Sequence, residues 1–110
     1  MDERLYIVTN PKKRTLYTRV TNNLQKRIVE HFLNRGDPKT FAGKYYCYCL
    51  VWYDRFPTMH EAIQAEKYIK GKKREWKVEL INKSNPQWNM LNESILGEWP
   101  PSKTLPPESS

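Results

Sequence analysis

The chain has 110 residues, 38% hydrophobic and 13% aromatic, which suits one packed domain and excludes a disordered chain. Nineteen basic side chains against 12 acidic ones give a formal net charge of +7, which favours a polyanionic partner, nucleic acid first. No stretch approaches the roughly 18 apolar residues of a membrane helix, and no basic amphipathic helix stands alone to bind a membrane surface. The start, MDERLYIVTN, lacks the pattern of a signal peptide, so we expect a cytoplasmic protein without a membrane partner.

The first half of the chain predicts a β-hairpin followed by a helix. Residues 4–9 and 15–21 are rich in β-branched and aromatic side chains, and an Asn-Pro pair between them starts a turn. Asn22 or Asn23 is a suitable N-cap for a helix that ends near Asn34. The helix has an apolar stripe of helical period, formed by Leu24, Ile28 and Phe32.

The second half predicts one strand, two helices and a tail. The run YCYCLVWY at residues 46–53 is typical of a buried strand, and helices follow over 58–70 and about 73–82. Residues 99–110 are rich in Pro and Ser and are predicted to be a disordered tail, which leaves 1–98 as the domain. The order β-β-α-β-α-α predicts an α+β fold.

Two cysteines lie close together in the third predicted strand. Cys47 and Cys49 would share one face of that strand, a geometry too constrained for an ordinary disulfide. Zinc would need both of them together with His31 and His60, the remaining His or Cys of the chain. We therefore expect buried, reduced thiols.

Two polar residues of the first helix lie beside its apolar stripe. Arg27 and His31 are four residues apart and so share one face, near the expected edge of the sheet. The alternative for both is the solvated side of an amphipathic helix.

One acid of the second helix falls on the buried stripe. Glu66 follows Ala62 and Ile63 at helical spacing, and a carboxylate there is costly unless it is paired or bound to a metal. The alternative to a metal is a structural ion pair with Arg27 or a lysine.

The hairpin contributes two tyrosines and an arginine. An alternation of period two places Tyr17 and Arg19 on one face of the second strand, and we expect Tyr6 to lie opposite Tyr17. Rings in the core with hydroxyls in water are the alternative for both tyrosines. Basic residues elsewhere are candidate phosphate contacts, although such runs are usually solvated surface: Lys12, Lys13, Arg14, Lys44, Lys70, Lys72, Lys73, Arg74 and Lys77.

From about Leu5 to Leu91 the chain resembles the GIY-YIG endonuclease superfamily, in its small stand-alone bacterial branch. The matching pieces are LYIVTN, LYTRVTNNLQKRIVEH, KTFAGKYYCYCLVWYDRF, EAIQAEKYIKGKKREWK and NPQW, in that order and at that spacing. The resemblance implies a three-stranded antiparallel sheet flanked by helices. It also implies hydrolysis of phosphodiester bonds in DNA, with branched or damaged DNA among the candidate substrates, and a divalent metal, Mg²⁺ or Mn²⁺.

The resemblance also assigns residues to the site. Tyr6 and Tyr17 stand at the tyrosines of the two motif halves, and Glu66 stands at the metal-binding glutamate. Arg27 and His31 stand at the arginine and the histidine of the first helix. In this chemistry a tyrosinate takes the proton of the attacking water, and Arg27 binds the phosphate oxygens as charge builds. His31 assists proton transfer or holds the phosphate, while Glu66 binds the metal.

The chain departs from the family pattern at both motif glycines. Arg4 replaces the first and Arg19 the second, whereas Asn85 keeps an asparagine near the end of the domain without a firm role. Two outcomes follow for Arg19. It points to solvent and adds a phosphate contact, or it fills the groove and pairs with Glu66, which would leave a nucleic-acid-binding module without catalysis. The retained site residues favour the active nuclease.

Overall fold

The computed structural model describes residues 3–101 and contains three strands and five helices in that range. The strands are β1 (Glu3–Thr9), β2 (Leu16–Thr21) and β3 (Cys49–Phe56). The helices are α1 (Leu24–Leu33), α2 (Phe41–Lys44), α3 (Met59–Lys70), α4 (Arg74–Ser84) and α5 (Asn92–Leu96). The predicted α+β fold is confirmed, with two short helices added.

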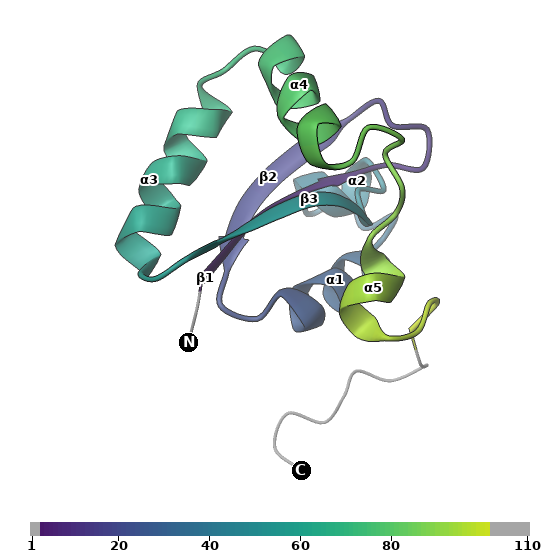
Figure 1. The fold of residues 1–110 in the computed structure, drawn as a ribbon. Helices are drawn as coiled ribbons and strands as arrows, with labels where there is room; N and C mark the ends of the chain where they lie inside the picture. Colours follow the sequence, from purple (N-terminus) through teal and green to yellow (C-terminus); the bar gives the residue numbers. More distant parts are fainter. Residues whose placement is uncertain (1–2, 102–110) are drawn as a thin grey trace.

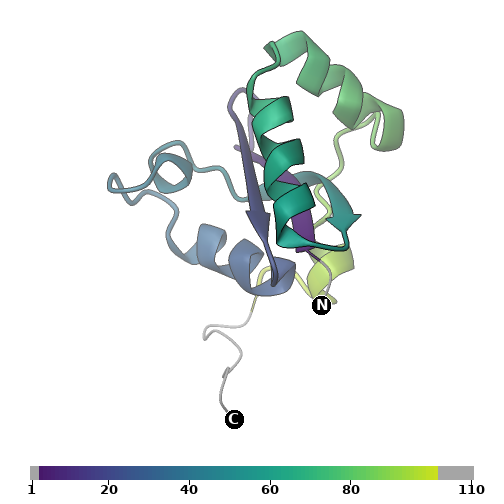
Figure 2. The same ribbon diagram turned by 90° about the vertical axis from the view of Figure 1, so that its left-hand side faces the viewer.

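The sheet has the strand order β2-β1-β3, and both pairs are antiparallel. Helices cover both faces of this sheet, with α3 and α4 on one face and α1, α2 and α5 on the other (Figure 1). A view turned by 90° shows β2 between α3 and the layer of α1 (Figure 2). The chain therefore forms three layers, with the central strand β1 buried from both sides.

Alternation along β1 builds two separate cores. Leu5 and Ile7 face α3 and α4, while Tyr6 and Val8 face α1, and all four are at most 1% exposed. The predicted alternation along β2 is confirmed as well. Leu16 and Val20 pack on the α3–α4 side of the sheet, while Tyr17 packs on the α1 side.

Side-chain caps fix where the main helices begin. The side chain of Asn23 accepts a hydrogen bond from the backbone N–H of Lys26 at the start of α1, as predicted. The hydroxyl of Thr58 accepts one from the N–H of Glu61 at the start of α3.

The third strand differs from its prediction. It begins at Cys49 rather than Tyr46, and it continues to Phe56, where it pairs with Glu3. Tyr46 has a left-handed φ of 58°, and the N–H of Cys47 donates to the carbonyl of Ala42, so this segment closes the α2 turn instead of extending the strand. The aromatic run suggested a longer strand because its composition says nothing about local backbone geometry.

Cys47 and Cys49 do not share a strand face, because β3 begins only at Cys49. Both cysteines are buried and free, as expected. Burial raises the pKa of each thiol to about 11. Within residues 3–101, no group of three or more His, Cys, Asp or Glu side chains could hold a metal ion.

The packed part of the chain extends past the predicted domain end at residue 98. The ring of Trp99 contacts Phe32 with centroids 4.9 Å apart, and it also stacks on Tyr48. The rest of the predicted tail, residues 102–110, lies outside the described residues. No helix in residues 3–101 is both long and apolar enough to span a membrane.

Candidate active site

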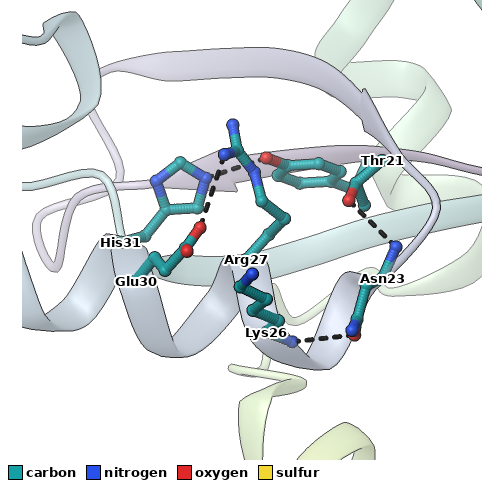
Figure 3. Close-up of polar contacts among 7 residues, drawn as sticks. Thr21, Asn23, Lys26, Arg27, Glu30 and His31 are labelled. Atoms are coloured by element: carbon teal, nitrogen blue, oxygen red, sulfur yellow. Dashed lines mark hydrogen bonds and ion pairs between the residues drawn. The ribbon is translucent and has the colours of Figure 1, made fainter. Parts of the chain in front are cut away.

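Helix α1 places three polar side chains at the edge of the sheet. Leu24, Ile28 and Val29 are buried on its inner face, so Arg27, Glu30 and His31 project beside that face rather than away from the molecule (Figure 3). All three of these side chains are half-buried. The prediction that Arg27 and His31 flank the stripe near the sheet is confirmed.

A buried tyrosine joins this cluster from the central strand. The hydroxyl of Tyr6 and Nε2 of His31 lie 2.8 Å apart, at hydrogen-bond distance, and Tyr6 is 0% exposed. Burial raises the pKa of Tyr6, although a hydrogen bond from Arg27 and the charge of Arg27 oppose that shift. Tyr6 therefore carries its proton at neutral pH.

The histidine is held in its neutral form. Burial lowers the pKa of His31 to about 4, and repulsion from Arg27 and Arg19 adds to the effect. A neutral imidazole has one donor and one acceptor nitrogen, so His31 can accept the proton of the Tyr6 hydroxyl or donate to its oxygen.

The second tyrosine lies diagonal to the first. Tyr6 pairs with Arg19 and Tyr17 pairs with Val8, so the expectation that the two tyrosines lie directly opposite is wrong. They still share one face of the sheet, because Tyr17 pairs with Val8, which lies two residues after Tyr6 in β1 and so points to the same side. The Tyr17 ring meets the edge of the His31 ring at 6.0 Å and stacks on Phe41 at 5.4 Å.

A cleft of about 120 Å³ opens at this cluster, and Tyr17, Arg27, Glu30 and His31 line it. A second groove of about 360 Å³ shares Arg27 and Glu30 as a common wall. Tyr6 lines neither opening. Of the two motif tyrosines, Tyr17 is therefore the one that a ligand in the cleft could reach.

Arg27 keeps its charge in this setting. Burial acts to lower the pKa of the guanidinium, but its hydrogen bond with Tyr6 and the charge of Glu30 outweigh burial, and the net shift is upward. Arg27 Nη1 and a carboxylate oxygen of Glu30 are 3.4 Å apart. The cluster thus holds one fixed positive charge at the mouth of the cleft.

Glu66 lies on α3, and its carboxylate contacts two cationic side chains. Its side chain is 13% exposed, and its Oε2 lies 3.2 Å from Lys70 Nζ and 3.8 Å from Arg19 Nε. The ion pair with a lysine was one of the predicted alternatives, whereas Arg27 pairs with Glu30 instead. Among the two outcomes for Arg19, the contact with Glu66 is the one present.

Arg19 connects Glu66 to the tyrosine cluster. Its guanidinium carbon lies 5.8 Å from the centre of the Tyr17 ring, on the side of the sheet that carries α1. Its side chain is nevertheless 44% exposed. Because β2 is an edge strand, Arg19 can reach around the edge to Glu66 and still face water.

The donor set around Glu66 suits one hard divalent cation. Mg²⁺ is usually held by one or two carboxylates and keeps several waters, so a single glutamate is a sufficient protein ligand. Both neighbouring cations lie on the same carboxylate oxygen, and their side chains are close to half exposed. Water partly screens ion pairs whose cations are this exposed.

The predicted phosphate contacts divide into separate groups. Lys70 belongs to the Glu66 cluster, and Lys44 lies in α2 near the site. Lys72 lies over the ring of Tyr68, on the opposite side of the sheet. Arg74 donates to the carbonyls of Arg14 and Lys13 at 2.7 and 3.1 Å, so its guanidinium holds the hairpin turn to α4. The exposed Lys12 and Lys73 and the half-buried Lys77 stay as predicted contacts.

Asn85 has a structural position outside this cluster. Its side chain is buried, and its Nδ2 donates to the carbonyls of Val51 and Asn89. Its Oδ1 accepts from the N–H of Asn89. These bonds anchor the turn after α4 to β3.

Sequence reasoning missed two members of the site. Glu30 follows Arg27 by three residues on a helix, and that spacing could have predicted the ion pair. Phe41 begins the four-residue helix α2, which is too short to show a periodicity, so its stacking on Tyr17 left no signal in the sequence.

Comparison with known proteins matches the stretch of chain that carries these residues. A family model described as the GIY-YIG catalytic domain matches residues 4–85. A UPF0213 protein of Staphylococcus saprophyticus is 30% identical over 82 residues, which cover 74% of this chain and 98% of that protein. A UPF0213 protein of Clostridium perfringens is 38% identical over 71 residues, covering 64% and 74% of the two chains.

A solved structure shares the fold. The solution NMR structure of a UPF0213 protein from Bacillus halodurans superposes with a TM-score of 0.51 at 25% sequence identity. The match covers 84% of this chain and 96% of that one.

Proposed function

The chain belongs to the GIY-YIG nuclease family, and we propose on that premise that it is an endonuclease hydrolysing phosphodiester bonds in DNA. We propose further that it works with one divalent cation, Mg²⁺ or Mn²⁺, held by Glu66. One observation supports this most strongly: Tyr17, Arg27 and His31 line a single cleft, and Arg19 links that cleft to Glu66.

Arg27 is the group that stabilises charge on the phosphate. Its guanidinium is half-buried, fully charged and aimed at the cleft mouth, where it can bind the non-bridging oxygens. Negative charge grows on those oxygens as water attacks phosphorus, so this contact strengthens in the transition state. Glu30 pairs with Arg27 in the free protein and fixes its direction.

Tyr17 is the group that takes a proton from the attacking water. It lines the cleft, whereas Tyr6 is enclosed and keeps its own proton. Tyr6 instead positions His31 through their hydrogen bond, and neutral His31 stands ready at the cleft wall to accept a proton. A divalent cation at Glu66 would supply positive charge to the leaving oxygen and to the tyrosinate.

In this proposal Arg19 pairs with Glu66 in the free protein and with substrate phosphates in the complex. In the free protein it pairs loosely with Glu66 at the sheet edge. With a divalent cation held by Glu66, the exposed arm of Arg19 would be free to bind the substrate phosphates, which a guanidinium binds well. Its replacement of the motif glycine is then compatible with activity.

A nicking assay on supercoiled plasmid, run beside cleavage of a branched DNA, tests the proposal. Wild type, Glu66→Ala and Arg19→Gly are compared with Mg²⁺ or Mn²⁺ present. Glu79→Ala serves as the matched control, because Glu79 is an exposed acid on α4 outside the site. We expect cleavage by wild type and Glu79→Ala and none by Glu66→Ala, while full activity in Glu66→Ala would contradict the metal assignment.

A second function has one observation in its favour, the two cations on Oε2 of Glu66. If they hold the carboxylate permanently, the chain is a nucleic-acid-binding module of the same fold. Cleavage by Arg19→Gly but not by wild type would support that reading. Its DNA affinity would then fall steeply with added salt, as expected for phosphate contacts.

A further inference from the structure

We propose that Phe41 and Tyr45 form a stacking platform for an unpaired nucleotide base beside the cleft. The substrate would then be DNA with an unpaired strand at the cleavage point rather than continuous duplex. This inference rests on the proposed nuclease function and names its substrate class.

A row of aromatic rings leads out of the cleft. The ring of Phe41 is stacked on Tyr17, with an angle of 18° between the planes, and Tyr45 follows with its centroid 4.8 Å from that of Phe41. Phe41 is 49% exposed and Tyr45 is 42% exposed. The row therefore begins at a proposed catalytic side chain and ends as open aromatic surface.

The segment that carries these rings is tightly braced. The hydroxyl of Thr40 accepts from the N–H of Gly43, and the carbonyl of Gly43 accepts from the N–H of Gly36. A Cβ on Gly43 would lie 2.6 Å from the carbonyl oxygen of Asp37 and 2.7 Å from that of Asn34, so the turn closes around this glycine. A braced segment presents its aromatic rings at little entropic cost.

The surroundings of the rings are basic. The Lys44 ammonium lies 5.4 Å from the centre of the Tyr45 ring, and Lys39 is exposed in the same loop. The segment around α2, coloured blue in Figure 2, projects from the molecule beside α1. Exposed rings bordered by lysines complement a nucleic acid, which offers flat bases joined by phosphates, better than they complement an apolar protein surface.

The base that stacks here must be unpaired. In continuous duplex each base is stacked between its neighbours and its faces are closed to a protein ring. In a flap, gap or loop the faces are open, and an aromatic side chain can replace a lost neighbour. A base held on Phe41 would place the adjoining phosphate close to Tyr17, since the two rings are in contact.

Fluorescence anisotropy with labelled DNA tests the platform without cleavage. A single strand, the matching duplex and a duplex with an unpaired flap are titrated with protein in EDTA, which removes divalent cations. Phe41→Leu keeps an apolar side chain but removes the ring, and Phe41→Tyr keeps the ring. Tyr68→Leu is the matched control, because Tyr68 is a more exposed aromatic, 58%, on the other side of the sheet.

We expect wild type to bind the single strand and the flap more tightly than the duplex. Phe41→Leu should lose at least about fivefold in affinity for unpaired DNA, with little change for duplex. Phe41→Tyr and Tyr68→Leu should bind as wild type does. Quenching of 2-aminopurine in the single strand by wild type, lost in Phe41→Leu, would report the stacking itself.

The platform is overturned if wild type binds duplex as tightly as unpaired DNA, or if Phe41→Leu binds like wild type. These results are independent of hydrolysis, because the measurement excludes metal. A protein that shows the expected binding but never cuts DNA with Mg²⁺ or Mn²⁺ would keep the platform and lose the proposed function.

Discussion

The two faces of the sheet are made by alternate residues of the same strands, yet they differ in what they bury. Under α3 and α4, Leu5 and Ile7 meet Ile69 and Ile81 in an apolar layer. Under α1, the corresponding layer includes Tyr6, whose hydroxyl contacts His31. One face buries an apolar layer, and the other holds polar and charged groups beside an open cleft.

This difference separates stability from chemistry. A buried polar group costs free energy unless it is hydrogen-bonded, and even then it adds little net stability, so a site on the α1 face must be supported from elsewhere. The α3–α4 face supplies that support through Leu5, Ile7, Ile69 and Ile81, which are buried there and have no polar side-chain atom to satisfy. Substitutions on the two faces should therefore act on different measurable quantities.

The largest expected effect lies on the apolar face. Ile81 is 0% exposed between α4 and the sheet, and Ile81→Ala should lower the free energy of unfolding by about 2–5 kcal/mol. Urea denaturation followed by circular dichroism measures the change. Leu33→Ala on α1 is the control, since Leu33 is 42% exposed and its loss should cost little. Equal losses of unfolding free energy in Ile81→Ala and Leu33→Ala would contradict the proposed difference in packing.

On the α1 face we expect a substitution to lower the rate of DNA cleavage rather than the stability of the fold. Arg27→Ala should reduce cleavage by about 10²-fold or more, because it removes the cation proposed to stabilise the transition state. Single-turnover cleavage at saturating protein measures it, and Arg35→Ala is the control, because Arg35 is exposed just past the end of the same helix. Arg27→Ala with undiminished cleavage would place the charge stabilisation elsewhere.

The polar face should also make stability depend on pH. The folded-state pKa of His31, about 4, lies below its ordinary value of 6.5, so the unfolded chain binds a proton in that window that the folded chain does not. Stability from this group is complete above about pH 6.5 and is lost as the pH falls to 4. Between pH 7 and 5 the loss should be about 2 kcal/mol.

Urea titrations of wild type and His31→Gln at both pH values isolate this contribution, because glutamine does not titrate. Wild type should lose more stability than the variant over this range. The same pH dependence in both proteins would show that other groups carry the effect.

The smallest difference should appear at the helix starts, where the two faces are alike. Asn23 caps α1 and Thr58 caps α3 by the same type of hydrogen bond. Asn23→Ala and Thr58→Ala should each cost about 1 kcal/mol, measured by thermal unfolding. A much larger loss at Asn23 would mean that the start of α1 also supports the site.

The sequence predicted the layers of this fold well, because periodicity reports on burial. The alternation in the hairpin and the apolar stripe of α1 each placed side chains on the correct face. The bounds of β3 and the existence of α2 were missed, since a left-handed residue at Tyr46 and a short capped turn leave no periodic pattern. Such segments are defined by backbone hydrogen bonds rather than by composition.

For the site, the sequence predicted which residues gather but not how they pair. Tyr6, Arg27 and His31 do meet at one edge of the sheet. The partner of Glu66 stayed open between a metal, Arg27, Arg19 and a lysine, because a long flexible cation can reach several acids from one position. Only the register of β1 with β2 shows that Arg19 lies across from Tyr6, within reach of Glu66.

The position of β1 at the centre of the sheet has a consequence for biosynthesis. Within this domain β1 is synthesised before its partner β3, which ends at Phe56, and before Ile81, which covers Leu5. A nascent chain that already carries Tyr6, Tyr17 and Arg27 therefore has no closed apolar face on which to fold. The proposed nuclease is assembled only when nearly all of the domain has been synthesised, so shorter nascent chains should carry no nuclease activity.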